Sequence, residues 1–337
     1  MSEEALTGRR FSAYAGFSLL IWLSVAAVCL CVGPGELLRL HGDTIGVRAS
    51  RVLTASLVGA ALAAAGVTFQ ALLRNPLASP YILGVSSGAT VGVMLSAFLL
   101  TAPWSKGLAV TRLPQNVYAL AFALVTMAAV YLLSRRHGQL EPLTLLLVGV
   151  MVTAFNGAIV MVLNLLVPYG VRADFVVWIM GLVSEDVSGW ELGWTAAGVA
   201  VGWAVMLAMS HQFNVQMLGE QTATTLGVRM DRLRLLGFLA ASIVTALAVS
   251  VSGPIGFVGL ICPHICRRLF GPDHRVLMLT ATTMGAAFLV SADTLVRALA
   301  NWTHGEMPVG VVTALCGGPF FIYLLRRQLA RGGQSPQ

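Results

Sequence analysis

The sequence predicts an all-α membrane protein with ten transmembrane helices and both termini in the cytoplasm. Of its 337 residues, 57% are hydrophobic and only 10% are charged. A charged side chain costs about 2.5–3.5 kcal/mol to insert at the centre of a bilayer, so a chain that lies there carries few of them. Apolar runs of about bilayer-spanning length, roughly 20 residues, recur along the whole chain. We expect helices in these runs, because lipid offers no hydrogen-bonding partners to free backbone groups.

The apolar runs define the predicted helices in order. The first follows Arg9 and Arg10 and is longer than the core of a signal peptide, so we expect it to be retained. Together the spans form a single transmembrane domain over residues 1–337. The predicted spans are 11–32, 52–72, 82–101, 115–133, 143–167, 192–210, 235–252, 255–269, 276–299 and 308–325.

The short eighth span is predicted from charge. Residues 235–269 form one apolar stretch that is interrupted only at Ser252-Gly253-Pro254, and arginines flank both of its ends. Basic residues favour the cytoplasmic side of a membrane. An even number of crossings must therefore separate the two ends, which favours a hairpin of two helices over one kinked helix.

The basic residues of the whole chain agree with this topology. Ten crossings would place fourteen of the 21 Lys and Arg residues in the cytoplasm and seven outside. Two of the loops between the spans are expected to be structured. The outer loop 168–191 contains a short amphipathic stretch, 175–181, typical of a helix at the membrane interface. The inner loop 211–234 is predicted to form short helices around Gly219 and Gly227.

Several kinds of chemistry are not expected. The chain has no G-x-x-x-x-G-K-[ST] phosphate-binding loop, so it should not hydrolyse ATP alone. Cys262, His264 and Cys266 lack a second ligand pair at metal-binding spacing, and we expect no metal site. The net charge of +7 is spread between the apolar runs, which disfavours nucleic acid as a partner.

Few ionisable groups fall well inside the predicted spans. Asp293 lies one helical turn before Arg297, a spacing typical of a local ion pair that lowers the cost of burial, although a functional position near the outer mouth is an alternative. Ion-driven transporters usually carry such groups at mid-membrane. Their scarcity favours another energy source, but a secondary transporter driven by an ion gradient stays open as the rival hypothesis.

Three long segments are more specific. Residues 59–89 read GAALAAAGVTFQALLRNPLASPYILGVSSGA, residues 253–275 read GPIGFVGLICPHICRRLFGPDHR, and residues 306–320 read EMPVGVVTALCGGPF. Together they closely resemble the FecCD-type permeases, the membrane subunits of type II ABC importers for ferric siderophores, haem and vitamin B12. The resemblance extends over nearly the whole chain, from about residue 48 to residue 327.

The resemblance implies partners and a location. It implies a homodimer of ten-helix subunits in the bacterial inner membrane, with two ATPase subunits docked on the cytoplasmic side. A periplasmic or lipid-anchored binding protein would deliver the substrate from outside. ATP and Mg²⁺ would be bound by the ATPase subunits, and this chain would bind no cofactor and catalyse no reaction by itself.

The resemblance also implies docking residues for the binding protein. The family pattern R-x-P-R corresponds here to Arg48 and Arg51, with Ser50 in place of the proline, and Arg297 matches a third arginine. In the family these arginines face carboxylates of the binding protein, which suits the forked geometry of guanidinium. Ser50 lacks the fixed backbone angle of the family proline, but both cations of the pattern are kept. The alternative role is that of interfacial anchors.

On the cytoplasmic side, the resemblance implies a coupling segment and a gate. The coupling segment would be a pair of short helices that fits a groove on the ATPase. Asn75 and Leu77, beside Pro76, would belong to the cytoplasmic gate, with an ordinary helix-end turn as the alternative. The coupling residues are Leu218, Gly219, Glu220, Ala223, Leu226 and Gly227.

Other polar and small residues in the spans have two readings. Asn156 and Asn164, in the fifth span, could line the pathway or form hydrogen bonds between helices. The small residues at Gly59, Gly66 and the Gly88–Gly92 pair favour close helix packing. The expected cargo is a ferric siderophore, with haem and a corrinoid as alternatives, because specificity should lie mainly in the binding protein.

Overall fold

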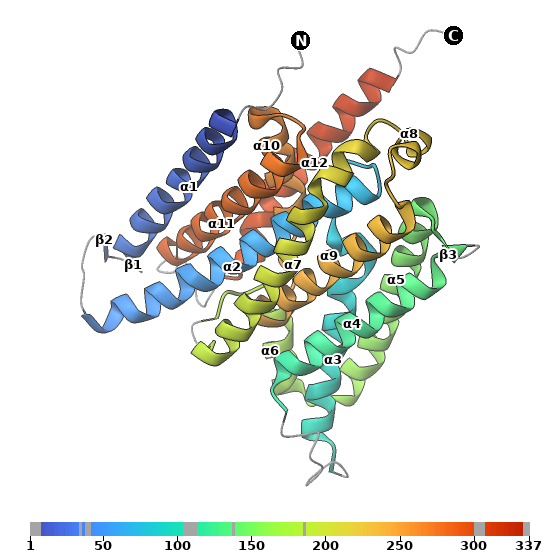
Figure 1. The fold of residues 1–337 in the computed structure, drawn as a ribbon. Coiled ribbons are helices and arrows are strands. Elements are labelled where there is room, and N and C mark those ends of the chain that lie inside the picture. Colours follow the sequence, from blue (N-terminus) through green and yellow to red (C-terminus); the bar gives the residue numbers. More distant parts are fainter. Residues whose placement is uncertain are drawn as a thin grey trace.

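A computed structural model describes residues 8–33, 36–37, 42–103, 113–136, 139–184, 187–299 and 307–332. Over these ranges the chain is a bundle of long helices (Figure 1). The elements are α1 (Gly8–Cys31), β1 (Val32–Gly33), β2 (Glu36–Leu37), α2 (Gly42–Leu72), η1 (Pro80–Leu83), α3 (Val85–Thr101), α4 (Gln115–Leu133), β3 (Arg135–Arg136), β4 (Gln139–Leu140), α5 (Pro142–Leu166), α6 (Tyr169–Ile179), α7 (Gly189–Gln216), α8 (Glu220–Thr225), α9 (Met230–Ser252), α10 (Val258–Phe270), α11 (His274–Ala298) and α12 (Val309–Gly332).

A helix covers each predicted span. Eight of the described helices are long and apolar enough to cross a bilayer, whereas α3 has 17 residues and α10 has 13. Helix α4 has the predicted bounds, 115–133. The largest difference is in α2, which begins at Gly42 and not at residue 52. Length and composition do not decide how many helices cross, so ten crossings stay a prediction.

The start of α1, the end of α12 and the short helix α8 lie at the same end of the bundle (Figure 1). We call this the α8 end. The start of α2 and the hairpin of β1 and β2 lie at the opposite end. This arrangement agrees with an even number of passes through the bundle.

Helix α2 is the centre of the bundle and contacts α11, α9, α10 and α7. Glycines make two of these contacts close. A Cβ atom at Gly59 would overlap the carbonyl of Gly285 in α11, and one at Gly66 would overlap the carbonyl of Gly259 in α10. The backbone of α2 therefore comes into direct contact with the backbones of α11 and α10, as small residues allow at helix interfaces in membranes. The packing role expected for these glycines is confirmed.

Gly88 and Gly92 of α3 have the same role against α4. A Cβ atom at Gly88 would meet the side chain of Thr126, and one at Gly92 would meet the carbonyl of Tyr118. The glycine pair, one helical turn apart, therefore forms the close contact between α3 and α4.

The break between the seventh and eighth spans is confirmed. Helix α9 ends at Ser252, and α10 begins at Val258. Between them, Gly253 and Phe257 both have positive φ, 66° and 69°. Two such residues cannot continue a right-handed helix, so the apolar stretch folds as two helices.

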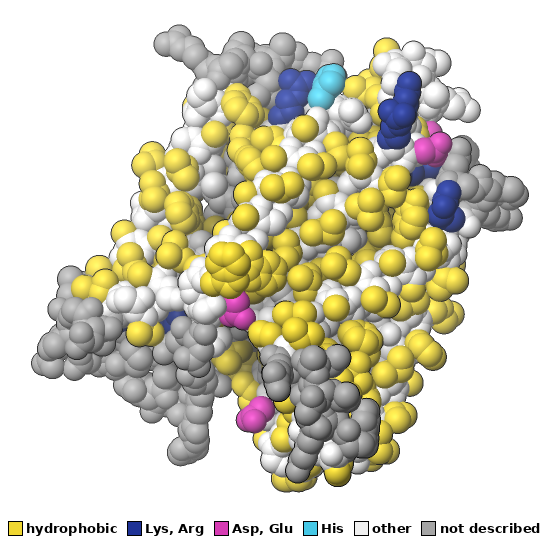
Figure 2. All heavy atoms as spheres, turned by 60° about the horizontal axis from the view of Figure 1, so that its bottom comes forward, with side chains coloured by type: hydrophobic (Ala, Val, Ile, Leu, Met, Phe, Trp, Pro, Cys, Tyr) yellow, Lys and Arg dark blue, Asp and Glu magenta, His cyan; other side chains and the backbone are white. Residues whose placement is uncertain are grey.

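The surface of the bundle is strongly apolar. Figure 2 shows a face covered mainly by hydrophobic side chains, with arginine and histidine side chains gathered towards its upper edge. On α5, the exposed residues include Phe155, Met161 and Leu165. A soluble monomer rarely exposes a continuous apolar surface of this kind, which is the expected exterior of a protein solvated by lipid.

The two loops differ in part from expectation. The loop 168–191 contains α6, which begins earlier than the predicted stretch and buries Phe175. The segment 211–234 was expected to contain a pair of short helices; α8, between Gly219 and Gly227, is one of them, and it is the only short helix that the structure describes in this segment. Helix α7 continues to Gln216, and α9 already begins at Met230; both extensions are mostly polar, but each buries a large apolar side chain, Phe213 in α7 and Leu233 in α9.

Candidate functional site

Helix α2 connects two groups of candidate residues. Arg48 and Arg51 lie in its first half, at the end of the bundle opposite α8, and Arg74 lies just beyond its last residue, at the α8 end. Each group contains a carboxylate from a distant part of the chain: Asp293 of α11 at one end and Glu220 of α8 at the other.

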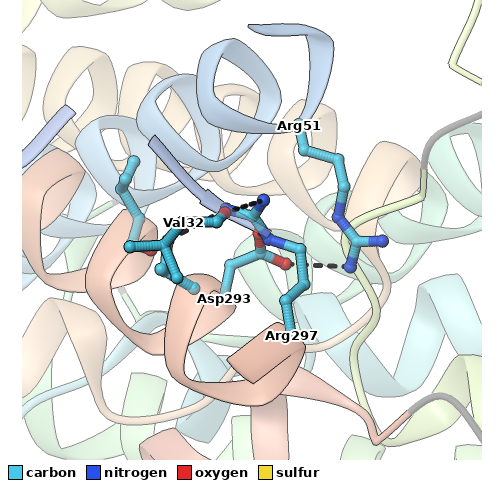
Figure 3. Close-up of polar contacts among 6 residues, drawn as sticks. Val32, Arg51, Asp293 and Arg297 are labelled. Atoms are coloured by element: carbon cyan, nitrogen blue, oxygen red, sulfur yellow. Dashed lines mark hydrogen bonds and ion pairs between the residues drawn. The ribbon is translucent and has the colours of Figure 1, made fainter. Parts of the chain in front are cut away.

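The arginine cluster consists of Arg48, Arg51, Asp293 and Arg297. Asp293 lies between two guanidinium groups (Figure 3): Arg51 Nη2 is 3.1 Å from its Oδ1, and Arg297 Nε is 3.1 Å from its Oδ2. The exposed fractions are 5% for Arg51, 1% for Asp293 and 5% for Arg297. Buried ions need such pairing, because desolvation would otherwise exclude them.

Backbone carbonyls from the end of α1 and from β1 complete the cluster. Arg48 Nη1 donates to the Leu30 carbonyl at 3.4 Å, and Arg297 Nη1 donates to the Val32 carbonyl at 3.4 Å. Arg297 Nη2 also donates to Thr294 Oγ1 at 2.9 Å. The arginines therefore fasten the chain after α1 to α2 and α11. In this single chain they are buried, and their predicted role in docking stays a prediction.

Sequence reasoning found half of this network. The pair between Asp293 and Arg297 was expected from their spacing of four residues, and the structure confirms it. The second pair, between Asp293 and Arg51, joins residues 242 positions apart. No local pattern indicates which distant cation will share a buried carboxylate.

At the α8 end, Glu220 connects three segments. Its Oε1 accepts from Arg234 Nη2 of α9 at 2.7 Å, and its Oε2 lies 3.9 Å from Arg74 Nη2. Arg234 also donates from Nη1 to the Leu140 carbonyl of β4 at 3.2 Å. We call Arg74, Glu220 and Arg234 the coupling triad. Arg234 was not among the candidate residues, because it resembles the other basic residues of its loop in sequence.

The turn after α2 contains the predicted gate residues. Asn75 Oδ1 accepts from the Leu77 backbone N–H at 3.0 Å, which forms an Asx turn. Arg74 has a left-handed backbone with φ of 48°. Leu77 packs against a small apolar cluster formed by Leu260 and Ile261 of α10 and Leu324 of α12. The helix-end turn is therefore present, and the role of its residues as a gate stays a prediction.

The predicted coupling residues form a compact projection. Leu218 and Leu226, which flank α8, are 65% and 62% exposed, whereas Ala223 is buried. Gly219 and Gly227 have φ of 111° and 86°, which L side chains rarely adopt. The glycines let the backbone reverse on both sides of α8, so two large apolar side chains stand free at this end.

The two asparagines of α5 differ. Asn156 is buried, and its Nδ2 donates to Ser87 Oγ of α3 at 3.0 Å and to Thr126 Oγ1 of α4 at 3.3 Å. It therefore bonds between helices, one of its two expected roles. Asn164 is only partly buried. The predicted pathway-lining role stays a prediction for both residues.

A cavity of about 350 Å³ lies between the coupling segment and the turn after α2. We call it the inner pocket. Its lining includes Gln70, Arg74, Gln216, Gly219, Arg267 and His274, from α2, α7, α10 and α11 and the turns beside them. Sequence reasoning missed this pocket, because its residues come from four separate segments and match no motif.

Comparisons with known proteins agree with these features. Residues 17–327 match the model of the FecCD transport family. The chain is 42% identical to the cobalamin import system permease protein BtuC of Halobacterium salinarum, over 85% of this chain and 73% of that one. It is 38% identical to the hemin transport system permease protein HmuU of Yersinia pestis, over 84% of this chain and 83% of that one.

A solved structure gives the same result for the fold. An inward-facing metal-chelate type ABC transporter matches with a TM-score of 0.79 and 31% identity, over 94% of this chain and 99% of that one. Together with the apolar exterior and the ordered set of long helices, these matches assign the chain. It belongs to the FecCD transport family, the multi-pass membrane permease subunits that work with ATPase and substrate-binding partners in ABC importers.

Proposed function

We propose that this chain moves a metal chelate across the bacterial inner membrane by alternating access, driven by ATP hydrolysis in partner subunits. The observation that carries the proposal is the ion-paired contact between α8 and the turn after α2, through Glu220 and Arg74. A movement imposed on α8 from the cytoplasm would reach this turn directly.

The proposed assembly is a homodimer with ten crossings in each subunit and both termini in the cytoplasm. The common location of α8, the start of α1 and the end of α12 supports the even number of crossings. Two ATPase subunits would dock against the projecting Leu218 and Leu226 and would bind ATP and Mg²⁺. This chain would bind no cofactor.

In the proposed cycle, ATP binding and hydrolysis shift α8 relative to the bundle. Arg234 ties Glu220 to α9 and to β4, so these elements would follow α8. Arg74 would carry the shift to Asn75 and Leu77. Leu77 would then change its contacts with α10 and α12, which opens or closes the inner gate.

A binding protein would dock at the opposite end, over Arg48, Arg51 and Arg297. Carboxylates on its two lobes would pair with these cations, and long-range attraction would speed the encounter. Because Asp293 holds Arg51 and Arg297 in the isolated chain, the carboxylates of the binding protein would add to these pairs and would not separate them. The binding protein would be periplasmic or lipid-anchored.

The proposed cargo is a large, preformed metal chelate. A ferric siderophore is the expectation from the sequence, and the names of the two relatives point to cobalamin and hemin as the alternatives. All three enclose the metal in an organic ligand, so the chain needs no metal-binding side chains of its own.

Reconstitution tests the proposal. Proteoliposomes that contain this chain and its cognate ATPase, with binding protein outside and ATP inside, should accumulate radiolabelled chelate. Omitting any one component should reduce uptake to the level of empty liposomes. Uptake by the chain alone, driven by a proton or sodium gradient, would establish the rival secondary transporter and exclude the importer.

A further inference from the structure

We infer that the inner pocket is a receptor for a carboxylate side chain of the docked ATPase subunit. The inference rests on the proposed function, since it assumes that an ATPase covers the α8 end. It adds a second contact, distinct from the projecting α8. The pocket lies at the root of the coupling segment, where Gly219 borders it, so a subunit seated on α8 would also cover the pocket.

The first observation is an unpartnered amide. Gln216, the last residue of α7, is only 3% exposed and lines the pocket. Neither its Nε2 nor its Oε1 has a hydrogen-bonding partner among the described residues. Buried polar groups in folded proteins are nearly always paired, so a side chain left without partners beside a cavity points to an occupant that supplies them.

The second observation is the charge of the lining. Arg267 of α10 and Arg74 both border the pocket, and none of the described lining residues is acidic. Arg267 donates from Nη2 to Gln70 Oε1 at 3.0 Å, which fixes the direction of its guanidinium group. Gln70 is itself held by its Nε2, which donates to the Gly259 carbonyl at 3.2 Å. The remaining donors of Arg267 suit an oxyanion.

The rest of the lining favours a side chain over a free ion. Phe213, Met217 and Pro76 give the pocket apolar walls, which fit the methylene groups of a glutamate better than a hydrated phosphate. A glutamate that entered between them would place its carboxylate beside the two guanidinium groups, and a rotation of the Gln216 side chain, whose amide is covered in the isolated chain, would let it donate to the same carboxylate. Such charge-assisted contacts are strong and directional.

The nearest acidic side chains do not fill this role. Glu220 binds Arg234 and approaches Arg74 from α8, but it does not line the pocket. Asp273 caps α11 through the Arg275 backbone N–H and accepts from Asn214. The chain thus uses its own carboxylates at the rim and leaves the interior of the pocket to a partner.

The test is the affinity of the purified cognate ATPase for this chain in nanodiscs. Gln216→Glu, which places a negative charge in the pocket, should weaken binding at least tenfold, and Arg267→Gln should weaken it about tenfold. Arg267→Lys should restore part of the loss. The matched control is Arg268→Gln, an exposed neighbour in α10 that does not line the pocket and should change the affinity less than twofold.

A charge swap identifies the occupant. Each exposed acidic residue of the ATPase is replaced by arginine, and one replacement should restore binding to the Gln216→Glu variant while weakening binding to the wild type. If Arg267→Gln fails to fold, Gln216→Glu and its rescue still decide the question, because they retain the contact between Arg267 and Gln70.

Other outcomes overturn the inference. Wild-type ATPase affinity in both pocket variants would exclude the pocket as a contact, while leaving the importer intact. Stabilisation of the isolated wild-type chain by inorganic phosphate, lost in Arg267→Gln without a change in ATPase affinity, would make the pocket a site for a free anion. A wild-type chain that does not bind the ATPase at all would instead contradict the proposed function.

Discussion

Arginines of α2 and of the turn after it reach the two opposite ends of the bundle, and these two ends are built differently. Arg51 is buried and lies 3.1 Å from Asp293, which is also buried and binds Arg297. Arg74 is half exposed and lies 3.9 Å from Glu220, which is half exposed as well. One end is a closed network, and the other is a loose contact that water can reach.

The difference follows from what each group has to do. A buried ion network resists rearrangement, because separating its members leaves charges without compensation. A half-exposed pair costs little to break, because water replaces the partner. The arginine cluster is thus suited to hold α1, α2 and α11 in register, and the coupling triad is suited to transmit a movement.

The largest expected effect is on the arginine cluster. Asp293→Ala removes the carboxylate that two buried guanidinium groups share, so the variant should lose about 3–5 kcal/mol of stability. Thermal or denaturant unfolding in detergent measures the loss. Asp231→Ala, at an exposed carboxylate in the first turn of α9, is the control and should change stability by less than about 0.5 kcal/mol. Equal effects of the two substitutions would remove the distinction between the ends.

An intermediate effect is expected at the coupling triad. Arg234→Ala removes a bond to Glu220 and a bond to the Leu140 carbonyl, and should cost about 1–2 kcal/mol because Glu220 remains half solvated. Stimulation of ATP hydrolysis by the loaded binding protein should fall roughly fivefold in the assembled complex, as a coupling loss of about 1 kcal/mol implies.

Arg232→Ala provides the matched control for this measurement. Arg232 is an exposed arginine on the same helix. The Arg232→Ala substitution should leave both the stability and the stimulation of ATP hydrolysis within about 20% of the wild-type values. A loss as large as that of Arg234→Ala would show that any arginine in the first turns of α9 has this effect, and that the triad has no special role.

The dependence of stability on salt concentration should also differ between the two ends. Added NaCl, from about 0.1 M to 1 M, shortens the Debye length from about 10 Å to 3 Å and weakens exposed ion pairs. The destabilisation caused by Glu220→Gln should therefore shrink in high salt, whereas that caused by Asp293→Ala should not change. Equal salt dependence of the two losses would mean that water reaches both carboxylates alike.

The smallest effect concerns the backbone of Arg74. A left-handed conformation costs an L residue about 1 kcal/mol relative to glycine, and the exposed pair with Glu220 is worth about as little. Arg74→Gly should therefore have nearly the stability of the wild type, and Arg74→Ala should be about 1 kcal/mol less stable than Arg74→Gly. Equal stability of the two variants would show that the turn can adopt an ordinary conformation.

The helices could be predicted well from the sequence alone. Charges are costly in lipid, so each membrane-spanning segment is a long apolar run that is easy to find in the sequence. The sequence located the end of α2, the break at Gly253 and the small-residue contacts of Gly59 and Gly66 for the same reason: each depends on local residue types. The resemblance to the FecCD-type permeases also singled out Glu220 and Arg297, whose roles in coupling and docking stay predictions.

What the sequence did not predict depends on contacts between distant segments. Nothing near Arg51 indicates that its partner is Asp293, and nothing near Arg234 distinguishes it from Arg232. The inner pocket requires Gln216 and Arg267, which approach each other only when α7 and α10 pack against α2. Such groups become visible only after the helices are assembled.

The central claim is that the two ends serve different partners, and one paired measurement tests it most directly. Binding of both the binding protein and the ATPase is measured in nanodiscs for Arg48→Gln, in the arginine cluster, and for Leu226→Asp, at the exposed edge of the coupling segment. Arg48→Gln should lower the affinity for the binding protein at least tenfold and leave the affinity for the ATPase unchanged. Leu226→Asp should lower the affinity for the ATPase at least tenfold and leave the affinity for the binding protein unchanged. If either substitution lowered both affinities equally, or lowered neither, the claim that the two ends bind different partners would be contradicted.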